Sequence, residues 1–262
     1  MRVLVTGGTH GYVGRHVVRR AGEVGLDAVP VGSAEADVRD PQAVDALLER
    51  HRPHAVVHTA YVQSDWDVTA TGAAHVAVAA ARHGARLVLV SSDVVFSGDA
   101  VHYDETAPPD PVTAYGAAKA AAETTALAVC DDVVVARTSL VLGDGASQHE
   151  RLVHALVAGA EGAMFEDEGR CPVHVGDLAA ALVELATHDL QGVLHVAGAD
   201  ATSRLELGRL IAQRDGLDPD LLRGRSRAGV PGPLDVRLDS TRAREVLSTR
   251  LRGAHEFLAP PS

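Results

Sequence analysis

Short apolar runs alternate with longer amphipathic segments over the first 140 residues. The runs are nearly continuous, as in parallel strands that are buried on both faces. They predict five strands, at Arg2–Thr6, Ala28–Val31, Ala55–His58, Arg86–Ser91 and Val133–Thr138. The segments between them predict four helices, at Tyr12–Val24, Pro41–Arg50, Thr69–His83 and Val112–Val129. This alternation is typical of the α/β class, and specifically of a Rossmann-like, doubly wound parallel sheet with right-handed crossovers.

The alternation weakens after residue 140. The later pattern predicts helices at Gln148–Gly159, Gly176–Thr187, Arg204–Arg214 and Thr241–Leu251, strands at Ala163–Glu166 and Val193–Val196, and an exposed loop at Arg223–Pro233. Either Asp239 or Ser240 is a suitable cap for the last helix. We therefore expect a sheet domain over 1–145 with parts of 170–200, and a small discontinuous C-terminal lobe over most of 146–262.

Composition narrows the class of protein. The 262 residues are 46% hydrophobic and 23% charged, which fits a globular chain. No apolar run approaches the ~18–20 residues that span a bilayer, and the N-terminus lacks the pattern of a signal peptide. Two cysteines, Cys130 and Cys171, make no disulfide framework, so we expect a reducing cytoplasm.

Charge and histidine usage indicate the kind of partner. The formal net charge of -11 argues against nucleic acid, because phosphate neutralisation needs a basic face. The 14 histidines are scattered and include no HExxH motif, so no metal site is expected. We expect a small-molecule substrate and no membrane partner. The helices predicted at 69–83 and 112–129 offer faces for a homodimer.

A glycine-rich loop follows the first strand and opens the first helix. Gly8, Gly11 and Gly14 form GxxGxxG, a spacing that lets the backbone approach a pyrophosphate at a helix N-terminus. The alternative is a strand–turn–helix connection without a ligand, but the flanking elements favour dinucleotide binding. The second strand ends Val31-Gly32-Ser33 without a carboxylate, and Arg15 could meet a 2′-phosphate. NADP(H) is therefore favoured over NAD(H), although Arg15 could equally be a solvated helix residue.

A tyrosine and a lysine stand one helical turn apart in the helix predicted at Val112–Val129. Tyr115 and Lys119 stand four residues apart, which places both on one helix face. Lys119 is the only lysine of the chain. A neighbouring ammonium group is expected to lower the pKa of the phenol toward the working range. A tyrosine–lysine pair without chemistry is the alternative, and the preceding glycine loop and Ser91-Ser92-Asp93 segment argue against it.

These motifs together resemble the extended short-chain dehydrogenase/reductases, and among them the dTDP-4-dehydrorhamnose reductase group of NDP-sugar 4-ketoreductases. The segments that carry the resemblance are Gly8–Gly14, Asp37–Pro41, Arg52–Ala60, Ser91–Gly98, Tyr103–Glu105, Pro109–Lys119, Arg137–Ser139 and Arg170–Ala179. The resemblance implies an NAD(P)H-dependent reductase of a carbonyl compound, such as a 4-keto sugar nucleotide. It also implies a cofactor-binding sheet domain and a substrate-binding lobe.

The resemblance implies a role for particular residues. Ser92 would hydrogen-bond the substrate carbonyl, Tyr115 would protonate its oxygen, and Lys119 would tune Tyr115 and hold the nicotinamide ribose. With the glycine loop, it implies cofactor contacts at Gly8, His10, Gly11, Tyr12, Val13, Gly14, Arg15, Ser33, Asp37, Val38, Ala60, Tyr61, Tyr115 and Lys119. It implies substrate contacts at Ser92, Asp93, Val94, Leu140 and Arg170.

Two residues depart from the family pattern where the substrate would lie. Val94 and Leu140 replace rings that are usual in the resembled family, and an aliphatic chain can pack but cannot donate a hydrogen bond. One interpretation is drift with compensation elsewhere. The other is a more apolar pocket, whose substrate is not an ordinary dTDP-sugar.

Two other functions remain open from the sequence. One is a cofactor-binding regulatory subunit without turnover, similar to the β subunit of methionine adenosyltransferase. The other is an NDP-sugar epimerase or dehydratase. Dehydration is disfavoured because Val94 follows Asp93 where the dehydratase pattern needs a glutamate.

Overall fold

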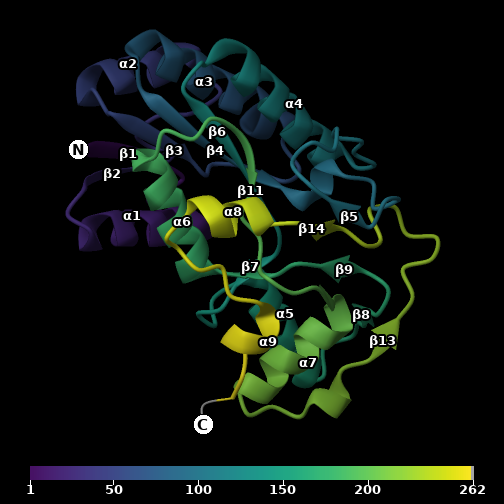
Figure 1. The fold of residues 1–262 in the computed structure, drawn as a ribbon. Coiled ribbons are helices and arrows are strands. Elements are labelled where there is room, and N and C mark those ends of the chain that lie inside the picture. The colour runs from purple at the N-terminus through teal and green to yellow at the C-terminus, as the bar shows by residue number, and fades with distance from the viewer. Residues whose placement is uncertain (261–262) are drawn as a thin grey trace.

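Six parallel strands form the central sheet of the computed structural model, which describes residues 1–260 (Figure 1). In chain order they are β1 (Arg2–Thr6), β2 (Asp27–Val31), β3 (Ala55–His58), β4 (Arg86–Ser92), β6 (Val133–Thr138) and β11 (Gly192–His195). Their spatial order is β11-β6-β4-β3-β1-β2. Since all are parallel, their carboxyl ends meet at one edge, where ligands bind in open α/β sheets.

Helices cover both faces of this sheet. One face carries α1 (Tyr12–Glu23) and α6 (Val175–Thr187), and the other carries α2 (Pro41–His51), α3 (Gly72–His83) and α4 (Ala114–Val129). Alternation along β1 explains the two cores, because Val3 and Val5 face α1 and α6 while Leu4 faces the other layer. Within residues 1–260, no helix is long and apolar enough to cross a membrane.

A second group of helices lies beyond the carboxyl edge of the sheet (Figure 1). It comprises α5 (Gln148–Val157), α7 (Arg204–Arg214) and α9 (Ala254–Phe257). These helices share a core of their own, which includes Val153, Ile211 and Leu258. The chain returns from this lobe to the sheet in α8 (Thr241–Val246), whose Ala243 is buried against the sheet.

Short strands and single turns complete the structure. The two-residue strands form four pairs: β7 (Val141–Leu142) with β10 (Val173–His174), β9 (Gly169–Arg170) with β12 (Thr202–Ser203), β8 (Met164–Phe165) with β13 (Gly224–Arg225), and β5 (His102–Tyr103) with β14 (Arg237–Leu238). The single turns are η1 (Asp67–Thr71, a π-helix), η2 (Asp93–Val95) and η3 (Pro219–Leu221).

The structure confirms the predicted fold class and corrects some element ends. The helix predicted at Thr241–Leu251 ends at Val246, and a further short helix, α9, follows it at Ala254–Phe257. The reason is a tertiary contact: the carboxylate of Glu184 accepts the backbone N–H groups of Ser248 and Thr249, at 2.6 and 2.9 Å. Those N–H groups are therefore held outside a helix. Within the loop predicted at 223–233, the first residues pair with β8 as β13.

Candidate active site

The glycine loop joins β1 to α1 through tight backbone contacts. A Cβ atom on Gly14 would lie 2.3 Å from the carbonyl oxygen of Gly7, so only glycine lets α1 pack this closely on the loop. Gly11 donates its N–H to the same oxygen at 2.9 Å. Gly7 has a φ of 71° and faces the cavity described below, whereas Gly8 and Gly14 do not line it. Of the predicted contacts, Gly8 and Gly14 therefore lie outside the cavity lining, and Gly7, which was not among them, borders it.

The first turn of α1 presents unsatisfied backbone donors at the loop. Its N-cap residue, Gly11, provides no side-chain hydrogen bond, and the first turn carries no acidic residue. Uncapped N–H groups with the positive end of the helix dipole make an anion site. The residues present therefore fit the pyrophosphate of a dinucleotide.

A cavity of about 1080 Å³ runs from this loop along the carboxyl edge of the sheet and into the second helical group. Most of the residues predicted for the site line it: His10, Gly11, Tyr12, Val13, Arg15, Ser33, Asp37, Val38, Ala60, Tyr61, Ser92, Asp93, Val94, Tyr115, Lys119, Leu140 and Arg170. The exceptions are the two glycines named above. The fold therefore brings the predicted cofactor and substrate residues to one continuous space.

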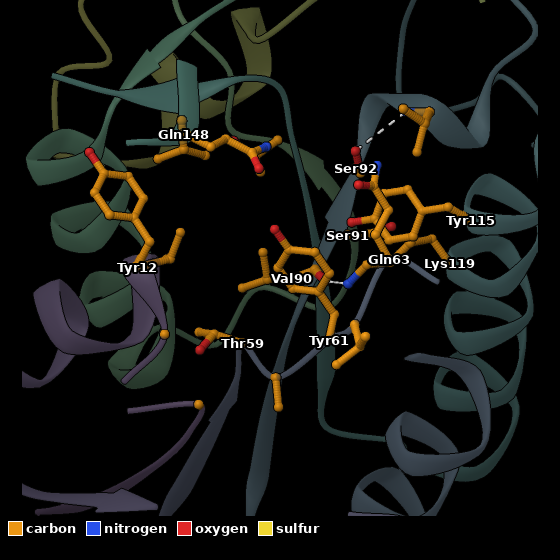
Figure 2. A pocket seen from close by; sticks show the side chains of 18 of the residues that line it. Tyr12, Thr59, Tyr61, Gln63, Val90, Ser91, Ser92, Tyr115, Lys119 and Gln148 are labelled. Carbon is orange, nitrogen blue, oxygen red and sulfur yellow. Dashed lines mark hydrogen bonds between the residues drawn. The ribbon is translucent and has the colours of Figure 1, made fainter. Parts of the chain in front are cut away.

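Ser92, Tyr115 and Lys119 lie together on one side of this cavity, across from Tyr12 (Figure 2). Ser92 ends β4, while Tyr115 and Lys119 share the first turns of α4. The helix begins there because the Thr113 side chain accepts the N–H of Gly116 at 3.0 Å. The α4 N-terminus thus sets the tyrosine and the lysine beside the end of β4.

Lys119 is buried and its ammonium group is held in place. Its Nζ donates to the carbonyl oxygen of Val90 at 2.9 Å and lies 5.1 Å from the ring centroid of Tyr61. Burial lowers the pKa of Lys119 to about 8, while the charge of Glu123 opposes that shift. The lysine is thus a fixed point charge that loses its proton within the range of ordinary buffers.

The pKa of Tyr115 is shifted upward, whereas the sequence led us to expect a downward shift. Burial raises this pKa, and Tyr61 and Asp93 raise it further. The tyrosine is packed against Tyr61, with ring centroids 5.7 Å apart, so its phenolate would be poorly solvated. The ammonium group of Lys119 is directed at the carbonyl oxygen of Val90. Tyr115 is therefore a protonated phenol at neutral pH, which suits it to donate a proton.

The carboxylate of Asp93 organises the end of β4. It is buried and accepts hydrogen bonds from Ser92 at 3.1 Å and from Ser139 at 2.6 Å. The guanidinium of Arg170 lies 3.5 Å from it. Asp93 and Arg170 are thus paired with each other at the cavity wall, which limits their role as free substrate ligands.

Arginines gather at the end of the cavity that the second helical group forms. Arg170, Arg204 and Arg227 all pair with the buried carboxylate of Glu168, the first two at 3.4 and 3.3 Å. Three guanidinium groups thus share the carboxylate of Glu168, although the chain as a whole carries a net charge of -11. Such a cluster suits a diphosphate. Sequence reasoning found only Arg170, because the others are brought together by tertiary structure.

Arg15 and Glu35 lie near the end of the cavity where the adenosine half of a cofactor would lie, although only Arg15 lines the cavity. Arg15 lies over the ring of Tyr12 and 3.4 Å from Asp144, so it already has an anionic partner. The Glu35 side chain accepts the N–H of Gly32 at 2.8 Å. A carboxylate therefore does stand near the end of β2, two residues beyond the Val31-Gly32-Ser33 segment.

Within residues 1–260, no group of three or more histidine, cysteine or acidic side chains could hold a metal ion.

Known proteins resemble this chain over nearly its whole length. Residues 1–253 match the family described as the RmlD substrate binding domain. A dTDP-4-dehydrorhamnose reductase of Mycobacterium tuberculosis is 33% identical over 247 residues, covering 88% of this chain and 81% of that protein. Methionine adenosyltransferase 2 subunit beta of Xenopus laevis is 27% identical over 275 residues, covering 94% and 82%.

A solved structure agrees with these relatives. The dTDP-4-dehydrorhamnose reductase of Bacillus anthracis, in complex with NADP, superposes with a TM-score of 0.87 at 25% identity, covering 98% of this chain and 95% of that one. The glycine loop, the serine–tyrosine–lysine group and the family match all support one assignment of the family. The chain belongs to the dTDP-4-dehydrorhamnose reductase family, within the extended short-chain dehydrogenase/reductases.

Proposed function

We propose that this protein is an NADPH-dependent reductase that converts the keto group of a 4-keto sugar nucleotide to an alcohol. One observation carries the proposal: Ser92, Tyr115 and Lys119 meet at a cavity that also contains the uncapped N-terminus of α1. The relatives named as reductases support it, as does the relative solved with NADP.

The cofactor-binding part of the proposal rests on residues 1–145 and parts of 170–200. The first turn of α1 would hold the pyrophosphate, Asp37 and Val38 would border the adenine, and Lys119 would hold the nicotinamide ribose. NADP(H) is favoured, with NAD(H) as the alternative, because Arg15 stands near the loop while Glu35 stands near the end of β2. When bound, the cofactor supplies the hydride.

The chain's own groups would handle the oxygen of the substrate. Ser92 would turn its hydroxyl proton, which Asp93 accepts at 3.1 Å in this structure, toward the carbonyl oxygen. Tyr115 would transfer its phenolic proton to that oxygen as negative charge develops there. The product is an alcohol, and the phenolate left on Tyr115 regains a proton from water. The ammonium group of Lys119 stabilises this phenolate, which burial otherwise disfavours.

The substrate-binding part of the proposal rests mostly on residues 146–262. The excess of guanidinium groups around Glu168 would bind the diphosphate of the sugar nucleotide. This leaves the sugar between the arginines and Ser92. We place the protein in the cytoplasm, since Cys130 and Cys171 are buried and unpaired, and we propose a homodimer through the exposed faces of α3 and α4.

A cofactor-oxidation screen tests the proposed reaction. The protein is mixed with NADPH or NADH and with either 4-keto-6-deoxy sugar nucleotides or unrelated ketones, and the loss of cofactor absorbance is followed. We expect rapid oxidation of NADPH only with the sugar nucleotides. Tight NADPH binding without oxidation of any compound would contradict the proposal and favour a regulatory subunit. Product formation without net cofactor consumption would favour an epimerase or dehydratase.

The charge of Lys119 predicts a pH dependence. Because its pKa is lowered to about 8, the ammonium form is complete below that value and is lost as the pH rises through it. Tyr115 keeps its proton over the same range, because its pKa is raised. We therefore expect kcat/KM to fall about tenfold per pH unit above about pH 8. Steady-state rates from about pH 6 to 10 measure this fall in kcat/KM. The Lys119→Met variant should abolish the inflection near pH 8. A flat profile across this range would contradict the role of Lys119.

A further inference from the structure

Gln63 borders the cavity from a turn that hydrogen bonds hold at both ends. The turn runs from Val62 to Asp65, and the N–H of Asp65 donates to the carbonyl oxygen of Val62 at 3.0 Å. The buried hydroxyl of Thr69 holds the start of the turn, because it donates to the same oxygen at 2.8 Å and accepts the N–H of Val62 at 3.1 Å. The carboxylate of Asp65 holds the other end by accepting the N–H of Val68 at 3.0 Å. The backbone that carries Gln63 is thus fixed by the protein itself.

The side chain of Gln63 lies at the reacting end of the cavity. It lines the cavity together with Ser92 and Tyr115, and Figure 2 shows it on their side, across from Tyr12. The residue is exposed, and its amide has no hydrogen-bond partner within residues 1–260. An amide group can both donate and accept hydrogen bonds. Both capacities are therefore available to a ligand in the cavity.

Several neighbours of Gln63 in the cavity wall have no such capacity left. The carboxylate of Asp93 accepts the hydroxyl of Ser92 at 3.1 Å and that of a second serine at 2.6 Å. The ammonium group of Lys119 donates to a backbone carbonyl at 2.9 Å. Val94 and Leu140 also line the cavity, but their side chains form no hydrogen bonds. A polar group of a ligand bound near Ser92 therefore finds in the Gln63 amide a partner that these neighbours do not offer.

We infer that Gln63 is a specificity-determining residue, which hydrogen-bonds the substrate hydroxyl group next to the keto group. The inference rests on the proposed reductase function, in which Ser92 and Tyr115 hold the carbonyl oxygen. Groups on the carbon atoms beside the keto carbon then lie in the part of the cavity that Gln63 borders. In a 4-keto-6-deoxyhexose only C3 carries a hydroxyl there, because C5 carries a methyl group and the ring oxygen. A hydroxyl matches an amide as donor and acceptor, and leaving it unpaired costs binding free energy.

A cycle of two proteins and two substrates tests the inference. The wild type and Gln63→Met are assayed with NADPH and either a 4-keto-6-deoxyhexose nucleotide, the parent, or its 3-deoxy analogue. Methionine keeps the unbranched shape of glutamine but lacks the amide. We expect Gln63→Met to lower kcat/KM for the parent about tenfold. With the analogue, the kcat/KM values of the two proteins should agree within about twofold, because the amide has no hydroxyl to bind.

The control is Gln213→Met, which makes the same exchange at an exposed position of α7 outside the cavity and should keep both values of kcat/KM. Three results would overturn the inference alone: an unchanged kcat/KM for the parent in Gln63→Met, an equal loss with both substrates, or a wild type that reduces the analogue as well as the parent. An equal loss together with a weaker Kd for NADPH would assign Gln63 to the cofactor instead. A wild type that binds NADPH but does not reduce the parent would overturn the proposed function, and the inference with it.

Discussion

Replacing Tyr115 by phenylalanine should lower kcat/KM for the sugar nucleotide by about 10²–10⁴-fold while the Kd for NADPH stays within about threefold. The ring stays in contact with Tyr61, so the shape of the site is kept. What is lost is the phenolic proton, which burial keeps on the oxygen at neutral pH. Steady-state kinetics give the first quantity, and quenching or enhancement of NADPH fluorescence gives the second.

A second tyrosine provides the control for this substitution. Tyr103 is buried away from the cavity, where its hydroxyl accepts the N–H groups of Gly98 and Ala100 at 2.9 and 3.1 Å. Tyr103→Phe removes the same atom and should keep turnover, at some loss of stability. Unchanged kcat/KM in Tyr115→Phe would contradict its role as the acid. An equal loss in both variants would indicate a general effect on the fold.

The fold could be predicted where short-range pattern decides the structure. The strands at 2–6, 55–58 and 133–138 and the helix at 204–214 have the predicted ends, because buried parallel strands and capped helices have distinct local signatures. The end of α8 could not be predicted. It depends on Glu184, whose carboxylate reaches the backbone of Ser248 from more than sixty residues away in the chain.

In the candidate site, too, local features could be predicted from the sequence and features that depend on tertiary structure could not. The motifs placed Ser92, Tyr115 and Lys119 in one cavity, because strand ends and helical spacing are local properties. The pKa of Tyr115 was predicted in the wrong direction, since burial, which the sequence does not report, raises it, and Tyr61 and Asp93 raise it further. The arginines around Glu168 were missed for a related reason: they come from separate strands, helices and loops and share no spacing.

A buried ion pair beneath the site carries the largest expected effect on stability. Glu123 and Arg137 are 2% and 3% exposed at their side chains, and their hydrogen bonds include one of 2.7 Å and two of 3.1 Å. Ser91 also donates to this carboxylate. Glu123→Ala leaves the guanidinium buried without a counter-ion, so we expect the free energy of unfolding to fall by about 3–5 kcal/mol. Thermal unfolding should then shift down by about 6–20 °C.

The double variant Glu123→Leu/Arg137→Met separates two contributions to stability. One is the cost of leaving a single charge buried without a partner, and the other is the net contribution of the ion pair. It removes both charges and keeps most of the volume, so it should recover most of the stability that Glu123→Ala loses. Glu123 also opposes the lowering of the Lys119 pKa. In the double variant we therefore expect the alkaline fall in kcat/KM to begin below pH 8, although the fold is stable. A wild-type pH profile in a stable double variant would show that Glu123 serves the fold alone, and a double variant as unstable as Glu123→Ala would contradict the ion-pair account.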